Sequence, residues 1–231
     1  MYFIHELTHE ISFPDPNFAS PEGLLAIGGD LSTERLICAY QNGIFPWYNK
    51  YEPIQWWCPD PRFVLLPESL IVHKSMQSLF KKQKFRVTFD QAFETVITSC
   101  GQIRRKGQRG TWITADMRKA YIKLHQEGFA HSVEVWEGNE IVGGLYGISL
   151  GKIFFGESMF TKVTDASKYG FITLVRALQK TGYTLIDCQQ QTKHLESLGA
   201  FAMDRKTFLQ RLKENDAACQ LWDHAKMTNN D

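Results

Sequence analysis

The sequence predicts an α+β fold in two parts, a small turn-rich N-terminal α/β domain over residues 1–62 and a larger domain over residues 63–231. In the larger part, hydrophobic residues recur with a helical period on both sides of residues 131–160, where the period becomes strand-like. Two glycine-containing turns divide that stretch into three strands, which predicts an antiparallel β-meander. A meander with helices before and after it is typical of a sheet covered by helices.

Residues 13–62 are rich in Pro, Gly and aromatic residues, which predicts turns around one short helix. That helix is expected over residues 33–42. Ser32 can cap its first turn, and Glu34 suits the positive N-terminal end of a helix. Gly43 follows the last residue, where a helix commonly ends.

The middle of the chain alternates helices with a strand. We expect a helix over residues 73–80, a strand over 85–88 and a second helix over 91–100. Thr114 can cap a third helix, which ends before Gly128. The apolar face of this third helix consists of Met117, Ala120, Tyr121 and Leu124.

The strands of the meander are expected at residues 131–136, 141–150 and 153–160. Asp165 can cap a following helix over residues 166–180. A strand over 184–188 and a short helix near 194–198 complete the pattern. N-acyltransferases of the acetyltransferase-like fold share this order of elements, a likeness that by itself is weak evidence of function.

Charge is segregated along the chain. The formal net charge is only +1, from 26 Lys and Arg against 25 Asp and Glu. Residues 66–123, however, hold twelve basic and four acidic residues, a net charge of +8, which leaves −7 elsewhere. Such a block can be a solvated surface, but two basic clusters with segregated acids favour a polyanion-binding face. No zinc-finger or RNP-type motif accompanies it, so contacts to phosphates are expected rather than sequence readout.

Several classes of protein lack their signals here. The five cysteines are odd in number and widely spaced, which argues against a disulfide scaffold. The seven histidines are scattered, with one H-x-x-x-H spacing at His5 and His9, and the one G-x-S-x-G match, at Ser149, falls at the end of an expected strand that is followed by another strand. A hydrolase nucleophile lies between a strand and a helix, so we expect no such nucleophile, and we expect no metal site. The N-terminus does not resemble a secretory signal, and no apolar run approaches about 20 residues. We therefore expect a cytoplasmic protein.

A series of sequence blocks, in order from about residue 13 to 208, resembles one known family. The blocks include Gly23–Leu31, Ala39–Trp47, Trp56–Arg62, Thr111–Ile113, Gly143–Gly147, Phe155–Phe160, Asp165–Lys168, Ile186–Gln189 and Ser197–Ala200. Together they are similar to the leucyl/phenylalanyl-tRNA–protein transferase family. One block alone would be weak, but the ordered set covers nearly the whole chain.

The resemblance implies an enzyme that moves leucine, phenylalanine or, less well, methionine from aminoacyl-tRNA to the α-amine of proteins with N-terminal Arg or Lys. In bacteria this marks the acceptor for degradation through the N-degron pathway. It also implies an N-terminal domain packed on an acetyltransferase-like domain (the acyl-CoA N-acyltransferase fold) without acetyl-CoA. No cofactor is expected, because the aminoacyl ester is already activated. We expect a monomer, since no coiled-coil or repeat pattern suggests assembly.

The resemblance implies Asp187 and Gln189 as the catalytic pair, with Asp187 polarising Gln189 and Gln189 handling the proton of the amine. Their spacing of two places both on one face of a strand. Because a carboxamide is a weak base, we prefer that Gln189 orients the amine. Asp187 would then supply negative charge to the transition state, or attract the acceptor's Arg or Lys. A purely structural Asp187 is the alternative.

An apolar binding pocket is also implied, in keeping with an aromatic content of 13%. Glu157 follows an aromatic strand, where a carboxylate needs a cation. The donor's α-ammonium can supply it, or else Lys168 or an arginine. By the family pattern the pocket walls are Trp47, Trp112, Leu145, Phe154, Leu174 and Leu178. Each is otherwise an ordinary core residue, and for the leucines the core role is preferred. Either tryptophan can also stack on the terminal adenine of tRNA.

The basic block supplies the predicted tRNA-binding residues. They are Lys81, Lys82, Lys84, Arg86, Arg104, Arg105, Lys106 and Arg109. Two other functions stay open. Residues 104–109 partly resemble the pyrophosphate loop of acetyl-CoA-dependent acetyltransferases, although Arg109 replaces the final small residue. A non-catalytic RNA-binding protein would also account for the basic block.

Overall fold

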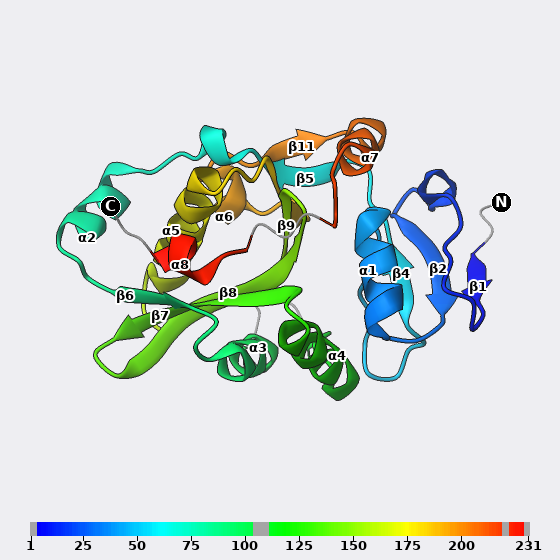
Figure 1. Cartoon of the computed structure of the whole chain (residues 1–231), viewed down its shortest axis with the longest axis horizontal. Helices are drawn as coiled ribbons and strands as arrows, with labels where there is room; N and C mark the ends of the chain where they lie inside the picture. The colour runs from blue at the N-terminus through cyan, green and yellow to red at the C-terminus, as the bar shows by residue number, and fades with distance from the viewer. Residues whose placement is uncertain (1–3, 104–110, 219–221, 229–231) are drawn as a thin grey trace.

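The computed structural model describes residues 4–103, 111–218 and 222–228. These residues form a four-stranded sheet near the N-terminus and a seven-stranded sheet in the rest of the chain (Figure 1). The small sheet ends at Trp57, and the first strand of the large sheet begins at Arg62. The mixed α+β class predicted from the sequence, with a small N-terminal part and a larger C-terminal part, is confirmed.

The N-terminal part combines four short strands with two helices. The strands pair in the order β1-β2-β4-β3. The elements are β1 His5–Leu7, the 3-10 helix η1 Pro16–Phe18, β2 Leu24–Gly28, α1 Thr33–Gln41, β3 Phe45–Pro46 and β4 Gln55–Trp57. The prediction of turns around one short helix was therefore incomplete, because it missed the four strands. Strands of two to five residues are too short to show an alternating pattern.

Helix α1 begins at the predicted residue, Thr33, and ends at Gln41, one residue before the predicted end. The Ser32 hydroxyl accepts a hydrogen bond from the Arg35 amide at 3.4 Å, which caps the first turn. Gly43 follows the helix with a φ of +73°, a left-handed conformation that glycine adopts at little cost. The turn at Gly43 leaves Tyr40, in the last turn of the helix, fully buried against the large sheet.

The seven strands of the large sheet lie in the order β11-β5-β10-β9-β8-β7-β6. Their bounds are β5 Arg62–Leu65, β6 Arg86–Phe89, β7 Ala130–Glu137, β8 Glu140–Leu150, β9 Ile153–Thr161, β10 Leu185–Gln189 and β11 Phe201–Met203. The predicted meander is confirmed as β7, β8 and β9. Neighbouring strands are antiparallel except β9 and β10, which run parallel.

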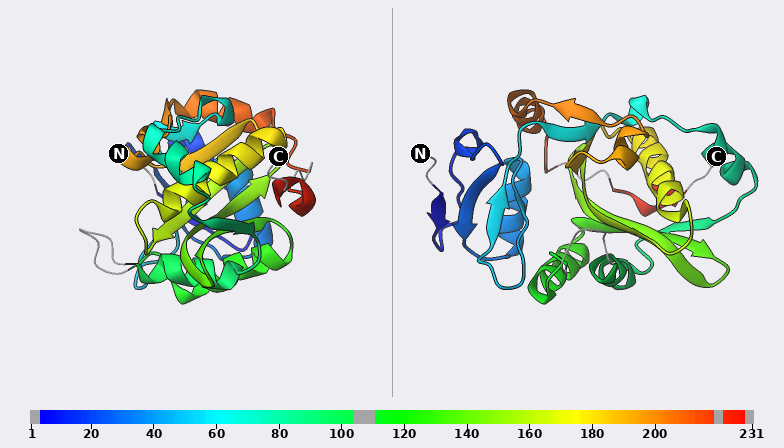
Figure 2. Two further views of the ribbon diagram at one scale, coloured as in Figure 1. Left: turned by 90° about the vertical axis from the view of Figure 1, so that its left-hand side faces the viewer. Right: turned by 180° about the vertical axis from the view of Figure 1, so that it is seen from behind.

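Helices cover both faces of this sheet (Figures 1 and 2). Their bounds are α2 Lys74–Lys81, α3 Phe93–Gln102, α4 Ala115–Gln126, α5 Ala166–Lys180, α6 Lys193–Glu196, α7 Arg205–Lys213 and α8 His224–Thr228, with a 3-10 turn η2 at Pro67–Ser69. One buried cluster joins α1, α3 and α4 to one face of the sheet, and a second joins α5 and α8 to the other. The helices expected from the sequence are present close to their predicted positions.

The start of α5 differs from its prediction. Asp165 precedes the helix in a left-handed conformation, with a φ of +67°, and its side chain makes no capping hydrogen bond. An N-cap residue normally adopts the extended conformation that directs its side chain to the first free amides. Asp165 instead forms an ion pair with Lys168 at 3.5 Å.

Candidate active site

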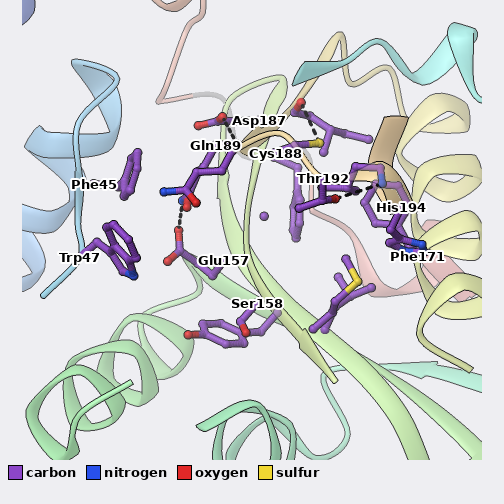
Figure 3. Close-up of a pocket in the computed structure, with 18 of the residues that line it drawn as sticks. Phe45, Trp47, Glu157, Ser158, Phe171, Asp187, Cys188, Gln189, Thr192 and His194 are labelled. Carbon is purple, nitrogen blue, oxygen red and sulfur yellow. Dashed lines mark hydrogen bonds between the residues drawn. The ribbon is translucent and has the colours of Figure 1, made fainter. Parts of the chain in front are cut away.

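A cavity of about 370 Å³ opens where β9 and β10 stop pairing (Figure 3). Pairing begins with Ile153 opposite Leu185 and ends with Phe155 opposite Asp187. The residues that follow in each strand line the cavity. Side chains from the β3 region, α5 and α6 close its sides. The lining residues are Phe45–Trp47, Trp112, Leu145, Tyr146, Phe154, Gly156–Met159, Phe171, Ile186–Gln190, Thr192, His194 and Leu195. Most of this surface is apolar.

Glu157 on β9 brings a buried carboxylate to the cavity. Its Oε1 accepts hydrogen bonds from the Tyr40 hydroxyl at 2.7 Å and the Gln189 amide nitrogen at 2.7 Å. Its Oε2 accepts one from the Tyr121 hydroxyl at 3.1 Å. The two tyrosine hydroxyls also contact each other. Three elements far apart in sequence, α1, α4 and β10, therefore meet at this carboxylate.

The donors around Glu157 are neutral groups. Burial raises the pKa of Glu157 to about 7, and the hydrogen bonds from Tyr40 and Tyr121 only partly oppose this. Burial and the nearby Glu157 carboxylate raise the pKa of both tyrosines well above the usual value, so they remain protonated. Among the described residues, no cation pairs with Glu157: Lys168, the alternative partner considered from the sequence, pairs with Asp165.

Asp187 on β10 is buried as well, but it has a counter-ion. The Arg62 guanidinium donates to both its oxygens, through Nε to Oδ1 at 2.8 Å and Nη2 to Oδ2 at 2.6 Å. The third arm of Arg62, Nη1, donates to the Gly43 carbonyl at 3.0 Å. The rings of Phe45 and Phe208 lie 4.7 and 4.8 Å from the guanidinium carbon. Arg62 thus joins the end of α1 to the strand that carries Asp187.

Gln189 lies at an irregular point of β10. Its φ is +61°, and the register of β10 against β5 shifts between Asp187 and Gln189. The expectation that both side chains share a face assumed a regular strand, and the bulge interrupts that regularity. The two residues remain linked, because the backbone amide of Gln189 donates to Asp187 Oδ1 at 2.9 Å. Figure 3 shows the Gln189 side chain directed at Glu157.

The structure brings four of the six expected wall residues to the cavity: Trp47, Trp112, Leu145 and Phe154. Leu174 and Leu178 do not line it and are fully buried in the core beneath α5. The cavity reaches α5 only at Phe171. Leu174 and Leu178 lie about 4.5 and 10.5 Å farther along the helix axis, at a rise of about 1.5 Å per residue.

The four predicted tRNA-binding residues that the structure describes do not line the cavity. Lys81 and Lys82 are exposed at the end of α2, and Lys84 and Arg86 are exposed beside it. Lys84 forms an ion pair with Glu137, and the Arg86 guanidinium lies 4.6 Å from the ring centre of Trp136. Strand β6 is the edge of the sheet opposite the N-terminal part (Figure 1). Arg104, Arg105, Lys106 and Arg109 lie outside the described residues.

Sequence reasoning missed three residues that shape the site: Arg62, Tyr40 and Tyr121. Arg62 ends a Pro-rich block, and both tyrosines resemble ordinary apolar positions of α1 and α4. Their partners lie 36 to 125 residues away, so no local pattern reveals them. They can be recognised because a polar side chain that is fully buried usually needs a partner. That burial is known only once the fold is known.

Other features of the described residues bear on cofactors. Within residues 4–103, 111–218 and 222–228, no group of three or more His, Cys, Asp or Glu side chains is arranged to hold a metal ion. Cys38, Cys58, Cys100 and Cys188 are free thiols. No helix in the described part of the chain is long and apolar enough to cross a bilayer.

The cavity has apolar walls and a buried carboxylate, Glu157, whose partners among the described residues are neutral, an arrangement suited to an apolar group beside a cation, as in an amino acid. The model of the leucyl/phenylalanyl-tRNA protein transferase family matches residues 64–213, and the model of that family's N-terminal domain matches residues 29–60. The chain therefore belongs to the leucyl/phenylalanyl-tRNA protein transferase family, as the sequence blocks predicted. By its family it is an aminoacyltransferase.

Curated relatives carry the same name. A leucyl/phenylalanyl-tRNA–protein transferase from Christiangramia forsetii is 56% identical over 214 residues, covering 92% of this chain and 100% of the relative. One from Pseudomonas fluorescens is 55% identical over 202 residues, covering 87% of this chain and 89% of the relative. Among solved structures, L-PGS from Bacillus licheniformis is 13% identical with a TM-score of 0.39, covering 82% of this chain and 65% of that chain, which is too remote to inform fold or function.

Proposed function

We propose that this protein transfers leucine, phenylalanine and, less well, methionine from aminoacyl-tRNA to the α-amine of proteins that begin with Arg or Lys. The reaction would take place in the cytoplasm and mark the acceptor for degradation. The observation that carries the proposal is the cavity, whose apolar walls end at Glu157. The donor's side chain suits the walls, and its α-ammonium suits the carboxylate.

The reaction is aminolysis of an ester. The neutral α-amine of the acceptor attacks the ester carbonyl, a C–N bond forms, and the bond to the 3′ oxygen of tRNA breaks. The nitrogen loses one proton and the leaving oxygen gains one, so the atoms balance without a further reactant. The protein's contribution is to bind both substrates, orient them and manage that proton.

Glu157 would hold the α-ammonium of the donor amino acid. Burial raises the pKa of this carboxyl to about 7, and an ammonium beside it would lower the pKa again and keep the group ionised. Tyr40 and Tyr121 orient the carboxylate without neutralising it, because both remain protonated donors. The charge of Glu157 is therefore left for the substrate.

Gln189 would orient the attacking amine. Its amide nitrogen donates to Glu157, which leaves its amide oxygen to accept a hydrogen bond from the amine. Asp187 would act as a positioning residue, since its Oδ1 holds the backbone amide of Gln189. Arg62 already balances the Asp187 charge, which favours this role over attraction of the acceptor's cationic side chain.

Selection of the donor would be steric. We assign Trp47, Trp112, Leu145 and Phe154 to contact with the donor side chain or, for the tryptophans, with the terminal adenine. Transfer energy alone separates side chains that differ by one methylene by only about 1–3 kcal/mol. The shape of these walls must therefore supply the rest of the discrimination.

The remaining assignments concern tRNA and architecture. We propose that Lys81, Lys82, Lys84 and Arg86, together with Arg104, Arg105, Lys106 and Arg109, contact phosphates of the tRNA. We also propose that residues 63–231 form an acetyltransferase-like domain with residues 1–62 as a separate domain, and that the protein acts as a monomer. The cavity at the single parallel strand pair of an otherwise antiparallel sheet supports the architecture.

Incubation of the protein with Phe-tRNA and a peptide that begins with Arg tests the proposal. The expected product is the peptide extended by one N-terminal Phe, detected by mass. A peptide that begins with Ala is the matched control and should stay unmodified. Failure to form Phe-Arg product would overturn the proposal. Acetylation of the peptide with acetyl-CoA would instead favour an acetyltransferase, and tRNA binding without chemistry an RNA-binding protein.

A further inference from the structure

The C-terminal segment Trp222–Thr228 packs against the core behind one wall of the cavity. It lies beyond residues 64–213, the part that the main family model matches. Helix α8 rests between α5 and β6 (Figures 1 and 2). Met227 is buried there, and the hydroxyl of Thr181, the residue after α5, lies 3.9 Å from its sulfur. The segment is therefore attached to the core at this end.

Trp222 is held at both the face and the edge of its indole. Its face stacks on the His131 imidazole, with ring centres 4.0 Å apart and planes at 14°. Its Nε1 donates to Asp90 Oδ2 at 2.9 Å. Asp90 also accepts from His131 Nδ1 at 2.8 Å and from the Ser132 amide at 2.7 Å. These contacts fix the indole in one orientation on the sheet.

The ring of Phe154 is shared by the cavity and Trp222. It lines the cavity and is stacked on the indole, with ring centres 5.9 Å apart and planes at 24°. It also rests on Gly147, where a Cβ would come within 2.6 Å of two ring carbons. Because the Phe154 ring packs on both Gly147 and Trp222, these two residues limit where this wall of the cavity stands.

We propose that Trp222 is a specificity-determining residue of the donor pocket: by backing Phe154 it sets the size of the apolar side chain that the cavity accepts. This inference rests on the proposed function, since it takes the cavity as the site of the donor side chain. Trp222 touches neither substrate and acts through Phe154. The C-terminal segment is then part of the pocket wall and more than a cover for the core.

Substitution Trp222→Ala tests this role through the preference between two donors. Removal of the indole lets Phe154 move back and enlarges the cavity, so the small Leu side chain loses contacts that the larger Phe side chain keeps. We expect the ratio of kcat/KM for Phe-tRNA to that for Leu-tRNA to rise about tenfold. Trp222→Phe, which keeps an aromatic ring but loses the bond to Asp90, should shift the ratio less in the same direction.

Phe85→Leu is the matched control. Phe85 is a buried aromatic residue of the same core, packed on Tyr169 with ring centres 5.4 Å apart, and it does not line the cavity. The control should lower Tm while leaving the Phe-to-Leu ratio unchanged. Equal losses with both donors in folded Trp222→Ala and Trp222→Phe would overturn the inference, because they indicate a general loss of stability.

A binding measurement separates failure of this inference from failure of the proposed function. If the wild-type protein transfers neither amino acid, the proposed function falls, but the pocket wall is still tested by the relative affinities for phenylalaninamide and leucinamide. Trp222→Ala should then shift that affinity ratio toward phenylalaninamide. An unchanged ratio, or no binding of either amide to the wild-type protein, would overturn the role of Trp222.

Discussion

Two buried carboxylates approach the same cavity, and their surroundings differ in one respect. Asp187 is paired with the Arg62 guanidinium through two hydrogen bonds, so its charge is balanced within the chain. Glu157 receives three hydrogen bonds from neutral groups and has no counter-ion among the described residues. We call the Asp187–Arg62 pair the complete region, because its charges balance without a ligand. We call Glu157 and its three neutral donors the incomplete region, because it still lacks a positive charge.

This difference assigns the two carboxylates different roles. A buried ion pair with good geometry fixes positions, and here it connects Gly43 at the end of α1 with the backbone of Gln189. A buried carboxylate without a cation is costly to ionise, and a cationic ligand removes that cost. Burial alone would lower the pKa of Arg62, but Asp187 more than offsets this and the pKa is raised. Arg62 therefore keeps its charge at any physiological pH.

The largest expected effect comes from breaking the complete region. Arg62→Met leaves the Asp187 carboxylate buried without a counter-ion, so the free energy of unfolding should fall by about 3–5 kcal/mol. Urea denaturation at neutral pH measures the loss. The double variant Arg62→Met with Asp187→Asn should recover most of it, because the amide carries no charge and can still accept the hydrogen bond from Gln189. Equal stability of the single variant and the wild type would contradict a structural role for the pair.

The next effect is the pH dependence of the incomplete region. The pKa of Glu157 is raised from an ordinary 4.5 to about 7, so between these values the folded state binds more protons than the unfolded state. The free energy of unfolding contributed by this group therefore falls as pH rises from about 4.5 to 7, by at most about 3.5 kcal/mol at roughly 1.4 kcal/mol per unit. Glu157→Gln removes the titration, so stability measured against the wild type should rise between pH 5 and pH 8.

The same variant separates stability from activity. Glu157→Gln keeps the shape of the side chain but cannot balance an ammonium, so kcat/KM for transfer should fall about 100-fold, or about 2.7 kcal/mol. A variant that is stable at pH 8 and inactive supports a carboxylate kept for the substrate. Full activity in Glu157→Gln would show that the donor's ammonium is bound elsewhere.

The local elements of the fold were predictable because each has its own pattern. Helix α1 has a serine before it and a glycine after it, and the meander has alternating residues between glycine turns. The strands of the N-terminal sheet were not, since β3 has only two residues and β1 and β4 only three. The left-handed conformation of Asp165 was also not predicted, because the capping rule assumes that the N-cap residue is extended.

Apart from the residues that the family resemblance implied, the site could be predicted only where a residue type in its local sequence required a partner. Glu157 was identified because a carboxylate among aromatic residues requires partners, and the structure places it at the cavity. The partners themselves were not predictable: Arg62 lies 125 residues from Asp187 and Tyr40 lies 117 residues from Glu157. Trp222 was missed for the same reason, because its contact with Phe154 depends on how the C-terminal segment returns to the sheet.

The smallest expected effect is a difference in stability between variants of the two tyrosines that donate hydrogen bonds to Glu157. Tyr40 donates at 2.7 Å and Tyr121 at 3.1 Å, so Tyr40→Phe should cost more stability than Tyr121→Phe. A hydrogen bond to a charged group contributes about 1.5–3 kcal/mol, which sets the range for Tyr40→Phe at pH 8, where the carboxyl is ionised. At pH 5 both losses should shrink, because the protonated carboxyl gains less from a donor. Urea denaturation at the two pH values gives both comparisons.

The double variant tests whether the two hydroxyls act as one unit. Because they also contact each other, removing both should cost less than the sum of the single losses. If the losses are additive and independent of pH, the tyrosines stabilise the junction of α1 and α4 through packing alone. If they are coupled and larger at high pH, the hydroxyls stabilise the Glu157 charge, which is the property that makes the incomplete region able to receive a cation.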